Sequence, residues 1–173
     1  MLIRPRRDSD IGACAGLVRE VHARDRYPRV LPGDVRSFLD LPGAYGCWVA
    51  DHGGQVAGHV ALLPRGVAAA LEVASTALGR PAGQLAVVAR LFVSPQARGQ
   101  GAGRLLLGAA AGEAAARGLW PVLDVDTGLA AAISLYQNCG WVRAGTVTVP
   151  LGDGTDLREY VYLGPPPAGA DAG

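Results

Sequence analysis

Residues 91–107 read LFVSPQARGQGAGRLLL, an apolar run that meets a glycine-rich turn and then a second apolar pattern. The first part is typical of a buried strand, and the last part is typical of a helix start. Gly99, Gly101 and Gly103 leave successive backbone N–H groups uncovered. The helix adds its own unpaired N–H groups and the positive end of its dipole. The pattern therefore predicts a strand, loop and helix that bind phosphate.

Two familiar glycine-rich phosphate loops fit this stretch poorly. A P-loop ends in Gly-Lys-Ser/Thr, but Arg104 and Leu105 follow Gly103 and the chain contains no lysine, which excludes a P-loop. The dinucleotide fingerprint G-x-G-x-x-G would have its last glycine at Arg104 or Leu106. Asp124 does lie about 20 residues further on, where that fingerprint has its ribose-binding acid. A nicotinamide-nucleotide-dependent oxidoreductase therefore stays open as a minor alternative.

The same stretch resembles the central motif of the GNAT superfamily of N-acetyltransferases. That motif is Arg/Gln-x-x-Gly-x-Gly/Ala after a strand that ends Val-x-Pro. Arg98, Gly101 and Gly103 match the first part, and Val93 and Pro95 match the second. In that family the loop and the helix start hold the pyrophosphate of acetyl-CoA, so the resemblance implies acetyl-CoA as cosubstrate.

The resemblance also implies which residues bind the cofactor. The main chain at Phe92 and Val93 would hydrogen-bond the pantetheine arm, and the N–H of Val93 would face the thioester oxygen as the oxyanion donor. The residues implied to hold the pyrophosphate are Arg98, Gly99, Gln100, Gly101, Ala102, Gly103 and Arg104. No metal is expected, because the three cysteines lack any Cys/His ligand spacing.

A second motif lies at residues 132–141, which read AISLYQNCGW. They resemble the family's Ala-x-x-x-Tyr-x-x-x-Gly-Phe helix, whose tyrosine often donates a proton to the sulfur of the leaving group. The resemblance implies that Tyr136 is the general acid. A phenol with a pKa of about 10 can protonate a thiolate that is held close to it.

Two positions depart from the family pattern. The asparagine usual three residues before the helix alanine is Leu129, and the strand 85–93 contains neither the usual glutamate nor any other acid or histidine. The general base is therefore unassigned from that strand. His59 is the tentative candidate, although a histidine in an apolar strand is usually a hydrogen-bonded core residue. Other candidates are Asp124, Asp126, Glu72 and a water chain to bulk solvent.

Composition narrows the function classes. With 173 residues the chain has room for one domain, expected at 1–163, followed by a flexible tail at 164–173. A net charge of +1 offers no broad attraction to nucleic acid or anionic membrane. The start resembles no signal peptide, and the apolar region 66–89 is interrupted by charges and a proline. We expect a cytoplasmic protein with reduced cysteines.

Periodicity and turn residues predict a mixed α/β order. Asp8, Ser9 and Asp10 are helix-capping residues that precede an amphipathic pattern from Ile11 to Val21. The other expected helices are a short one after Asp34 and those at 67–78, 101–117 and 129–138; the expected strands are 2–5, 46–50, 55–63, 85–93, 121–126, 141–149 and 157–163. This order predicts a central mixed sheet with helices on both faces, the GNAT-like acyl-CoA N-acyltransferase fold by resemblance.

The resulting hypothesis is an acetyl-CoA-dependent N-acetyltransferase. It would transfer the acetyl group to a primary amine of a small molecule or peptide by direct attack on the thioester. The first two helices and the segment 67–78 would shape the acceptor pocket, and an exposed Ala/Leu face would permit a homodimer. The missing glutamate and asparagine motivate an alternative, a non-catalytic acyl-CoA-binding sensor or regulatory protein.

Overall fold

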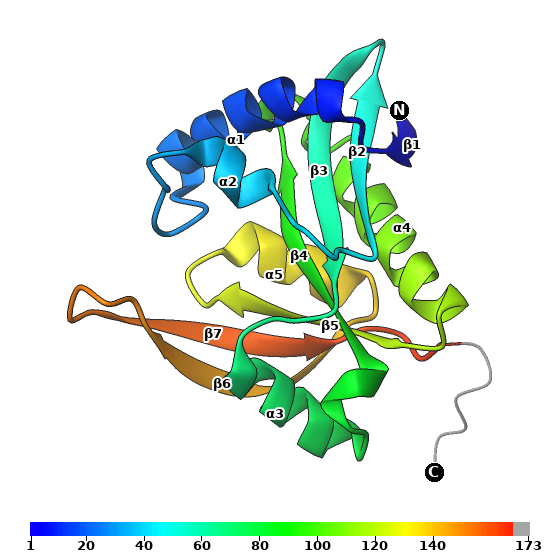
Figure 1. Cartoon of the computed structure of the whole chain (residues 1–173), viewed down its shortest axis with the longest axis vertical. Helices are drawn as coiled ribbons and strands as arrows, with labels where there is room; N and C mark the ends of the chain where they lie inside the picture. Colours follow the sequence, from blue (N-terminus) through cyan, green and yellow to red (C-terminus); the bar gives the residue numbers. More distant parts are fainter. Residues whose placement is uncertain (168–173) are drawn as a thin grey trace. The chain divides into compact units, whose positions relative to one another are not determined.

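A computed structural model describes residues 1–167 (Figure 1). Its helices and strands are β1 (Leu2–Pro5), α1 (Ile11–Asp25), α2 (Val35–Leu39), β2 (Gly46–His52), β3 (Gln55–Leu63), α3 (Ala68–Leu78), β4 (Leu85–Val93), α4 (Ala102–Ala116), β5 (Trp120–Asp126), α5 (Ala130–Asn138), β6 (Val142–Pro150) and β7 (Asp156–Leu163). Each expected element is present, with bounds that differ by at most a few residues from the prediction.

The predicted mixed sheet is confirmed. It has seven strands in the order β1-β2-β3-β4-β5-β7-β6. The β4–β5 pair is parallel, while the pairs β1–β2, β2–β3, β5–β7 and β6–β7 are antiparallel. Contacts divide the chain into two compact units, one of residues 1–63 and 88–110, the other of residues 64–87 and 111–173. Both β4 and α4 contribute residues to both units.

The first unit has helices on both faces of its strands. On one face, α1 and α2 bury a cluster that includes Leu17, Val18 and Leu39 against Val49 and Phe92. On the other face, the first turns of α4 approach β3. A Cβ added to Gly58 would lie 2.9 Å from Leu106 Cδ1 and 3.0 Å from the Phe92 carbonyl oxygen. Only glycine permits this close approach of helix and strand.

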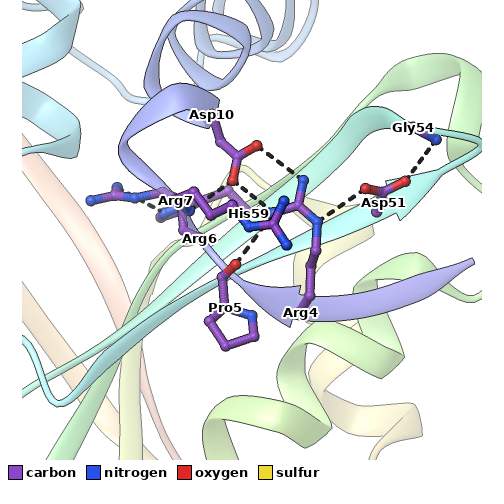
Figure 2. Close-up of polar contacts among 8 residues, drawn as sticks. All are labelled: Arg4, Pro5, Arg6, Arg7, Asp10, Asp51, Gly54 and His59. Atoms are coloured by element: carbon purple, nitrogen blue, oxygen red, sulfur yellow. Dashed lines mark hydrogen bonds and ion pairs between the residues drawn. The ribbon is translucent and has the colours of Figure 1, made fainter.

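An arginine ties the N-terminal strand to its surroundings in the first unit. Arg4 Nη1 donates to Asp10 Oδ2 at 2.7 Å, and Arg4 Nε donates to Asp51 Oδ2 at 3.0 Å (Figure 2). The Asp10 carboxylate also accepts from Arg7 N at 2.7 Å. Asp10 therefore holds the turn before α1 and does not cap α1 with its side chain, contrary to the expectation from sequence.

The second unit contains the parallel pair and the closing hairpin. Leu85–Val87 pair with Trp120–Val122, and β7 lies between β5 and β6. Helix α3 packs on β6 so closely that a Cβ on Gly145 would lie 2.8 Å from Val73 Cγ1. After β7, Gly164 N donates to Pro121 O at 2.8 Å, so the first residue of the expected tail is bound to the sheet. Residues 168–173 of that tail lie outside the described residues.

Two kinds of feature are absent from the described part of the chain. Between residues 1 and 167, none of the helices combines the length and the apolar character that a membrane span requires. The same residues include no group of three or more His, Cys, Asp or Glu side chains placed to hold a metal ion.

Candidate functional site

The glycine-rich loop joins β4 to α4 within the first unit. Ser94 N donates to Ala57 O at 2.8 Å, and the Ser94 side chain then caps a short 3-10 turn at Pro95–Ala97 by accepting from Gln96 N. Gly99 and Gly101 follow with φ angles of 76° and 83°. These values lie in the left-handed region, which glycine adopts without the steric cost that a Cβ would add. The glycines therefore allow the chain to reverse sharply into the helix.

The start of α4 has backbone donors without a partner inside the helix. The first backbone hydrogen bond of this helix is donated by Leu105 N to Gly101 O at 3.0 Å. The N–H groups at residues 102–104 precede it and have no intrahelical acceptor. They point along the helix axis at its positive end, where an anion is stabilised. The predicted cofactor-binding residues Gly101, Ala102 and Gly103 thus lie at a helix terminus of the kind that favours an anion.

Side chains of the loop fasten it to α1. Arg98 forms a bidentate ion pair with Asp25, in which Nη1 lies 3.2 Å from Oδ1 and Nη2 contacts Oδ2. This pair lowers the pKa of Asp25. Gln96 Nε2 donates to Glu20 Oε1 at 2.7 Å. The Arg98 side chain therefore acts here as an anchor for the loop, while Arg104 is exposed on the first turn of α4.

The two predicted pantetheine-binding residues end β4 with side chains on opposite faces. Phe92 is 3% exposed and lies in the core beneath α1 and α2, where its ring stacks on His59 with a centroid separation of 5.2 Å. Val93 faces the α4 side, because its Cγ2 would lie 3.3 Å from a Cβ on Gly58. Both side chains are held by packing, so the main chain is the part of these residues that can bind a ligand.

His59 is a fully buried core residue with both ring nitrogens engaged. Nε2 lies 3.2 Å from Arg6 Nη1, and Nδ1 lies 3.0 Å from the Arg90 carbonyl oxygen (Figure 2 shows the Arg6 contact). Because a guanidinium only donates, Nε2 accepts and Nδ1 carries the proton that is donated to Arg90. Burial, with the nearby Arg6 and Arg90 charges, lowers the pKa of His59 to about 4. His59, the tentative base of the sequence analysis, is therefore a neutral histidine within the core.

Acid should destabilise the protein through His59. Its pKa of about 4 in the fold lies below the ordinary value of 6.5, so the unfolded chain takes up the proton first as the pH falls. The stability conferred by neutral His59 is complete above pH 6.5 and is lost progressively toward pH 4. Between pH 7 and pH 5 we expect a loss of about 2 kcal/mol.

Urea unfolding of a His59→Gln variant at these two pH values checks this expectation. The variant should lack that pH-dependent loss, whereas His52→Gln, at an exposed histidine of β2, should keep it. An equal pH dependence in wild type and His59→Gln would contradict a buried neutral His59.

Tyr136 lies in α5 of the second unit. It is 6% exposed, and its ring centroid lies 6.1 Å from that of Trp141 and 5.9 Å from that of Tyr162. Gln137 Nε2 donates to the hydroxyl of Tyr162 at 3.2 Å. Aromatic packing therefore sets the orientation of the Tyr136 ring. Its role as general acid stays a prediction.

The acidic candidates occupy different environments in the second unit. Glu72 is exposed on α3. Asp126 Oδ1 accepts from Gly128 N at 2.8 Å, which closes the turn before α5. Glu159 of β7, which sequence reasoning missed, pairs with Asp126 across the sheet. Its Oε2 is buried and has no hydrogen-bond partner among the described residues.

The pKa of the Glu159 carboxyl group is shifted. Burial, reinforced by the neighbouring Asp124 and Asp126 carboxylates, raises the pKa of Glu159 to about 7. The sequence contained one signal for a carboxyl group with a raised pKa. Alternation along the strand places Asp124 and Asp126 on one face of β5, and an adjacent strand can place a third acid beside them. The pairing of β5 with β7 depends on long-range topology, and the sequence does not reveal it.

Comparison with known proteins relates this chain to acetyltransferases. Residues 17–141 match the model of the acetyltransferase (GNAT) family. Rat N-acetyltransferase family 8 member 2 is 35% identical over 157 residues, which are 86% of this chain but only 64% of the rat protein. The ribosomal-protein-alanine N-acetyltransferase of Brucella melitensis shares the fold, with a TM-score of 0.70, 23% identity and coverage of 94% of this chain and 98% of that one.

A putative streptothricin acetyltransferase of Bacillus anthracis, solved in complex with acetyl coenzyme A, is a more distant structural neighbour. Its TM-score is 0.55 at 18% identity, with 72% of this chain and 64% of that chain covered. The family match spans the region from α1 through the glycine-rich loop to the end of α5. This chain therefore belongs to the GNAT family of acetyltransferases.

Proposed function

We propose that this acetyltransferase moves the acetyl group of acetyl-CoA to a primary amine of a small molecule or peptide. The observation that carries the proposal is the loop with left-handed Gly99 and Gly101 at the N-terminus of α4, a geometry suited to a pyrophosphate. Two similar proteins support this proposal. The rat relative is named an N-acetyltransferase, and the Bacillus anthracis neighbour was solved in complex with acetyl coenzyme A. Its cytoplasmic location stays a prediction.

The proposed reaction is a direct transfer. The amine nitrogen attacks the thioester carbonyl carbon, which forms the C–N bond and moves negative charge to the carbonyl oxygen. The N–H of Val93 stabilises that oxygen, an effect of the kind that an oxyanion hole provides. The C–S bond then breaks, and the phenol of Tyr136 gives its proton to the departing thiolate. The amine's extra proton passes to a base.

Among the acids of the second unit, we propose Glu159 as the base. A base works best when its pKa is close to the operating pH, and the pKa of Glu159 is raised to about 7. Its Oε2 is buried without a hydrogen-bond partner among residues 1–167, and a side-chain hydrogen bond with Asp124 also favours the protonated form of Glu159. His59 is less suited, because its Nε2 lies 3.2 Å from Arg6 Nη1.

A Glu159→Gln variant should lose the low-pH limb of the rate profile. In the wild type, kcat/KM should rise through pH 7 as Glu159 deprotonates. The variant should be at least tenfold slower at pH 8 and should lack that rise, since loss of a general base costs roughly 100-fold or more. Glu113→Gln, at a half-buried glutamate of α4 that pairs with Arg117, serves as the matched control. A variant that keeps the wild-type profile would exclude Glu159.

Two measurements on the wild type test the proposed function itself. The first is thermal unfolding with acetyl-CoA, CoA or NAD, because a ligand that binds only the folded state raises its stability. The second is release of CoA thiol in the presence of an amine panel. Stabilisation by acetyl-CoA with amine-dependent thiol release supports the transferase, whereas stabilisation without release against any amine favours the acyl-CoA sensor. A response to NAD alone would favour the oxidoreductase.

A further inference from the structure

The glycine-rich loop between β4 and α4 has a flexible backbone. Three of the five residues from Gly99 to Gly103 are glycines, and glycine loses more conformational freedom on ordering than any other residue. Gly99 and Gly101 have φ angles of 76° and 83°, so the turn depends on conformations that a glycine can readily leave. Such a loop binds an anion more tightly when other contacts already hold it in the binding conformation.

Gln96 is the centre of one set of contacts that hold the loop. Its side-chain Oε1 accepts from the Ser94 hydroxyl, and its backbone carbonyl oxygen accepts from Gln100 Nε2 at 3.1 Å. Its Nε2 donates to Glu20 Oε1 at 2.7 Å. These contacts join both ends of the segment 94–100 to a carboxylate of α1. The side chain of Gln100, which the resemblance implied to bind the pyrophosphate, is turned back onto the loop.

Arg98 provides a second attachment to α1. Its Nη1 lies 3.2 Å from Asp25 Oδ1, and its Nη2 contacts Asp25 Oδ2. The hydrogen bonds with Asp25, reinforced by the charges of Asp25 and Glu20, raise the pKa of Arg98. A guanidinium that is already matched by a bidentate carboxylate has less attraction left for a second anion. Arg98 is therefore better suited to holding the loop than to binding the pyrophosphate.

Helix α1 gives these two carboxylates a rigid support. Glu20 and Asp25 are five residues apart, which is about 7.5 Å along a helix axis, so the loop is attached at two separate points. Ala97, between the two attached loop residues, is 6% exposed, so the loop is packed there as well. The helix itself is fixed in the core of the first unit by the buried side chains of Cys14, Leu17, Val18 and Val21.

We infer that Glu20 and Asp25 are positioning residues for acetyl-CoA, which act through Gln96 and Arg98 to hold the loop so that main-chain N–H groups at the start of α4 meet the pyrophosphate. This inference rests on the proposed acetyltransferase function. Simple electrostatics predicts that carboxylates beside an anion site weaken binding, so that their removal should strengthen it. Positioning predicts the opposite, because removal of the carboxylates releases the loop.

The variants Asp25→Asn and Glu20→Gln keep the shape of each side chain and remove its charge. Each should raise the KM for acetyl-CoA about threefold with kcat unchanged, and the double variant roughly tenfold, since separate contacts contribute almost additively. S-acetylpantetheine has the thioester and the pantetheine arm but no pyrophosphate. Its kcat/KM should be the same in the wild type and the variants, whereas a general loosening of the fold would lower it. Thiol release gives both parameters.

The variant Arg98→Gln distinguishes support of the loop from direct binding of the cofactor. As a support, Arg98 should cost the same as Asp25 when it is replaced. Arg98→Gln combined with Asp25→Asn should then be no worse than either alone, because each removes the same ion pair. The matched control is Asp51→Asn, which breaks the ion pair with Arg4 at 3.0 Å in the same unit and should keep the wild-type KM for acetyl-CoA.

Several outcomes would overturn the positioning role. They are an unchanged or lower KM for acetyl-CoA in both Asp25→Asn and Glu20→Gln, an equal loss with S-acetylpantetheine, and the same increase in KM in Asp51→Asn. A much larger loss in Arg98→Gln than in Asp25→Asn would make Arg98 a ligand of the pyrophosphate and overturn its role as a support. A wild type that acetyl-CoA does not stabilise would instead reject the proposed function.

Discussion

Gly101→Glu is expected to abolish the stabilisation of the protein by acetyl-CoA. At a ligand concentration 100 times Kd, the wild type should gain about 2.7 kcal/mol of unfolding free energy, and the variant should gain none. Gly101 has a φ of 83°, and the N–H groups of the first turn of α4 follow it. Glutamate adds a Cβ to this left-handed position and a negative charge where the pyrophosphate would lie. Thermal unfolding at rising acetyl-CoA concentration measures the effect.

Two control variants show whether charge or strain is responsible. Gly108→Glu makes the same substitution on an exposed position of α4, where a Cβ would meet no atom within 4 Å. It should bind acetyl-CoA normally. Gly101→Ala shares the backbone strain without the charge and should keep part of the stabilisation. If Gly101→Glu were stabilised as strongly as Gly108→Glu, the loop would not be the acetyl-CoA site.

Tyr136→Phe should slow acetyl transfer by roughly 100-fold to 10,000-fold, the range expected when a general acid is removed. The phenylalanine ring fills the same space beside Trp141 and Tyr162, so the fold and the binding of acetyl-CoA should change little. The loss should therefore appear in kcat more than in KM. Steady-state kinetics of thiol release with a saturating amine provides the measurement.

Tyr162→Phe is the matched control for this variant. Tyr162 is also buried, and its hydroxyl accepts a hydrogen bond from Gln137. Its replacement should cost about 1 kcal/mol of stability and leave kcat within a few fold. A Tyr136→Phe enzyme with unchanged kcat would assign protonation of the thiolate to another group or to water.

Local sequence patterns predicted the secondary structure closely. The helix expected at 101–117 is Ala102–Ala116, and the helix after Asp34 is Val35–Leu39, capped by Asp34 as expected. These boundaries follow from glycines, prolines and capping residues that act within a few positions of one another. The exception was Asp10, whose carboxylate binds the side chain of Arg4, six residues away, and the backbone N–H of Arg7 instead of capping α1.

The candidate site was predicted less completely, because much of it depends on distant contacts. The loop glycines were evident from spacing alone. In contrast, Arg98 and Asp25 are 73 residues apart, and their ion pair requires α1 to lie beside the loop. The altered pKa values of His59 and Glu159 arise from burial and from neighbours on other strands.

The division of β4 between the two units has a consequence for the nascent chain. When the first 63 residues have left the ribosome, β4, the strand beside β3, has not yet been synthesised. Residues 64–87, which belong to the other unit, must emerge before residues 88–93 of β4. At about 5–20 residues per second, β3 has an unpaired edge for seconds during synthesis. Such an edge can pair with another chain. Codon choice and chaperone binding over residues 64–93 should therefore influence the yield of folded protein.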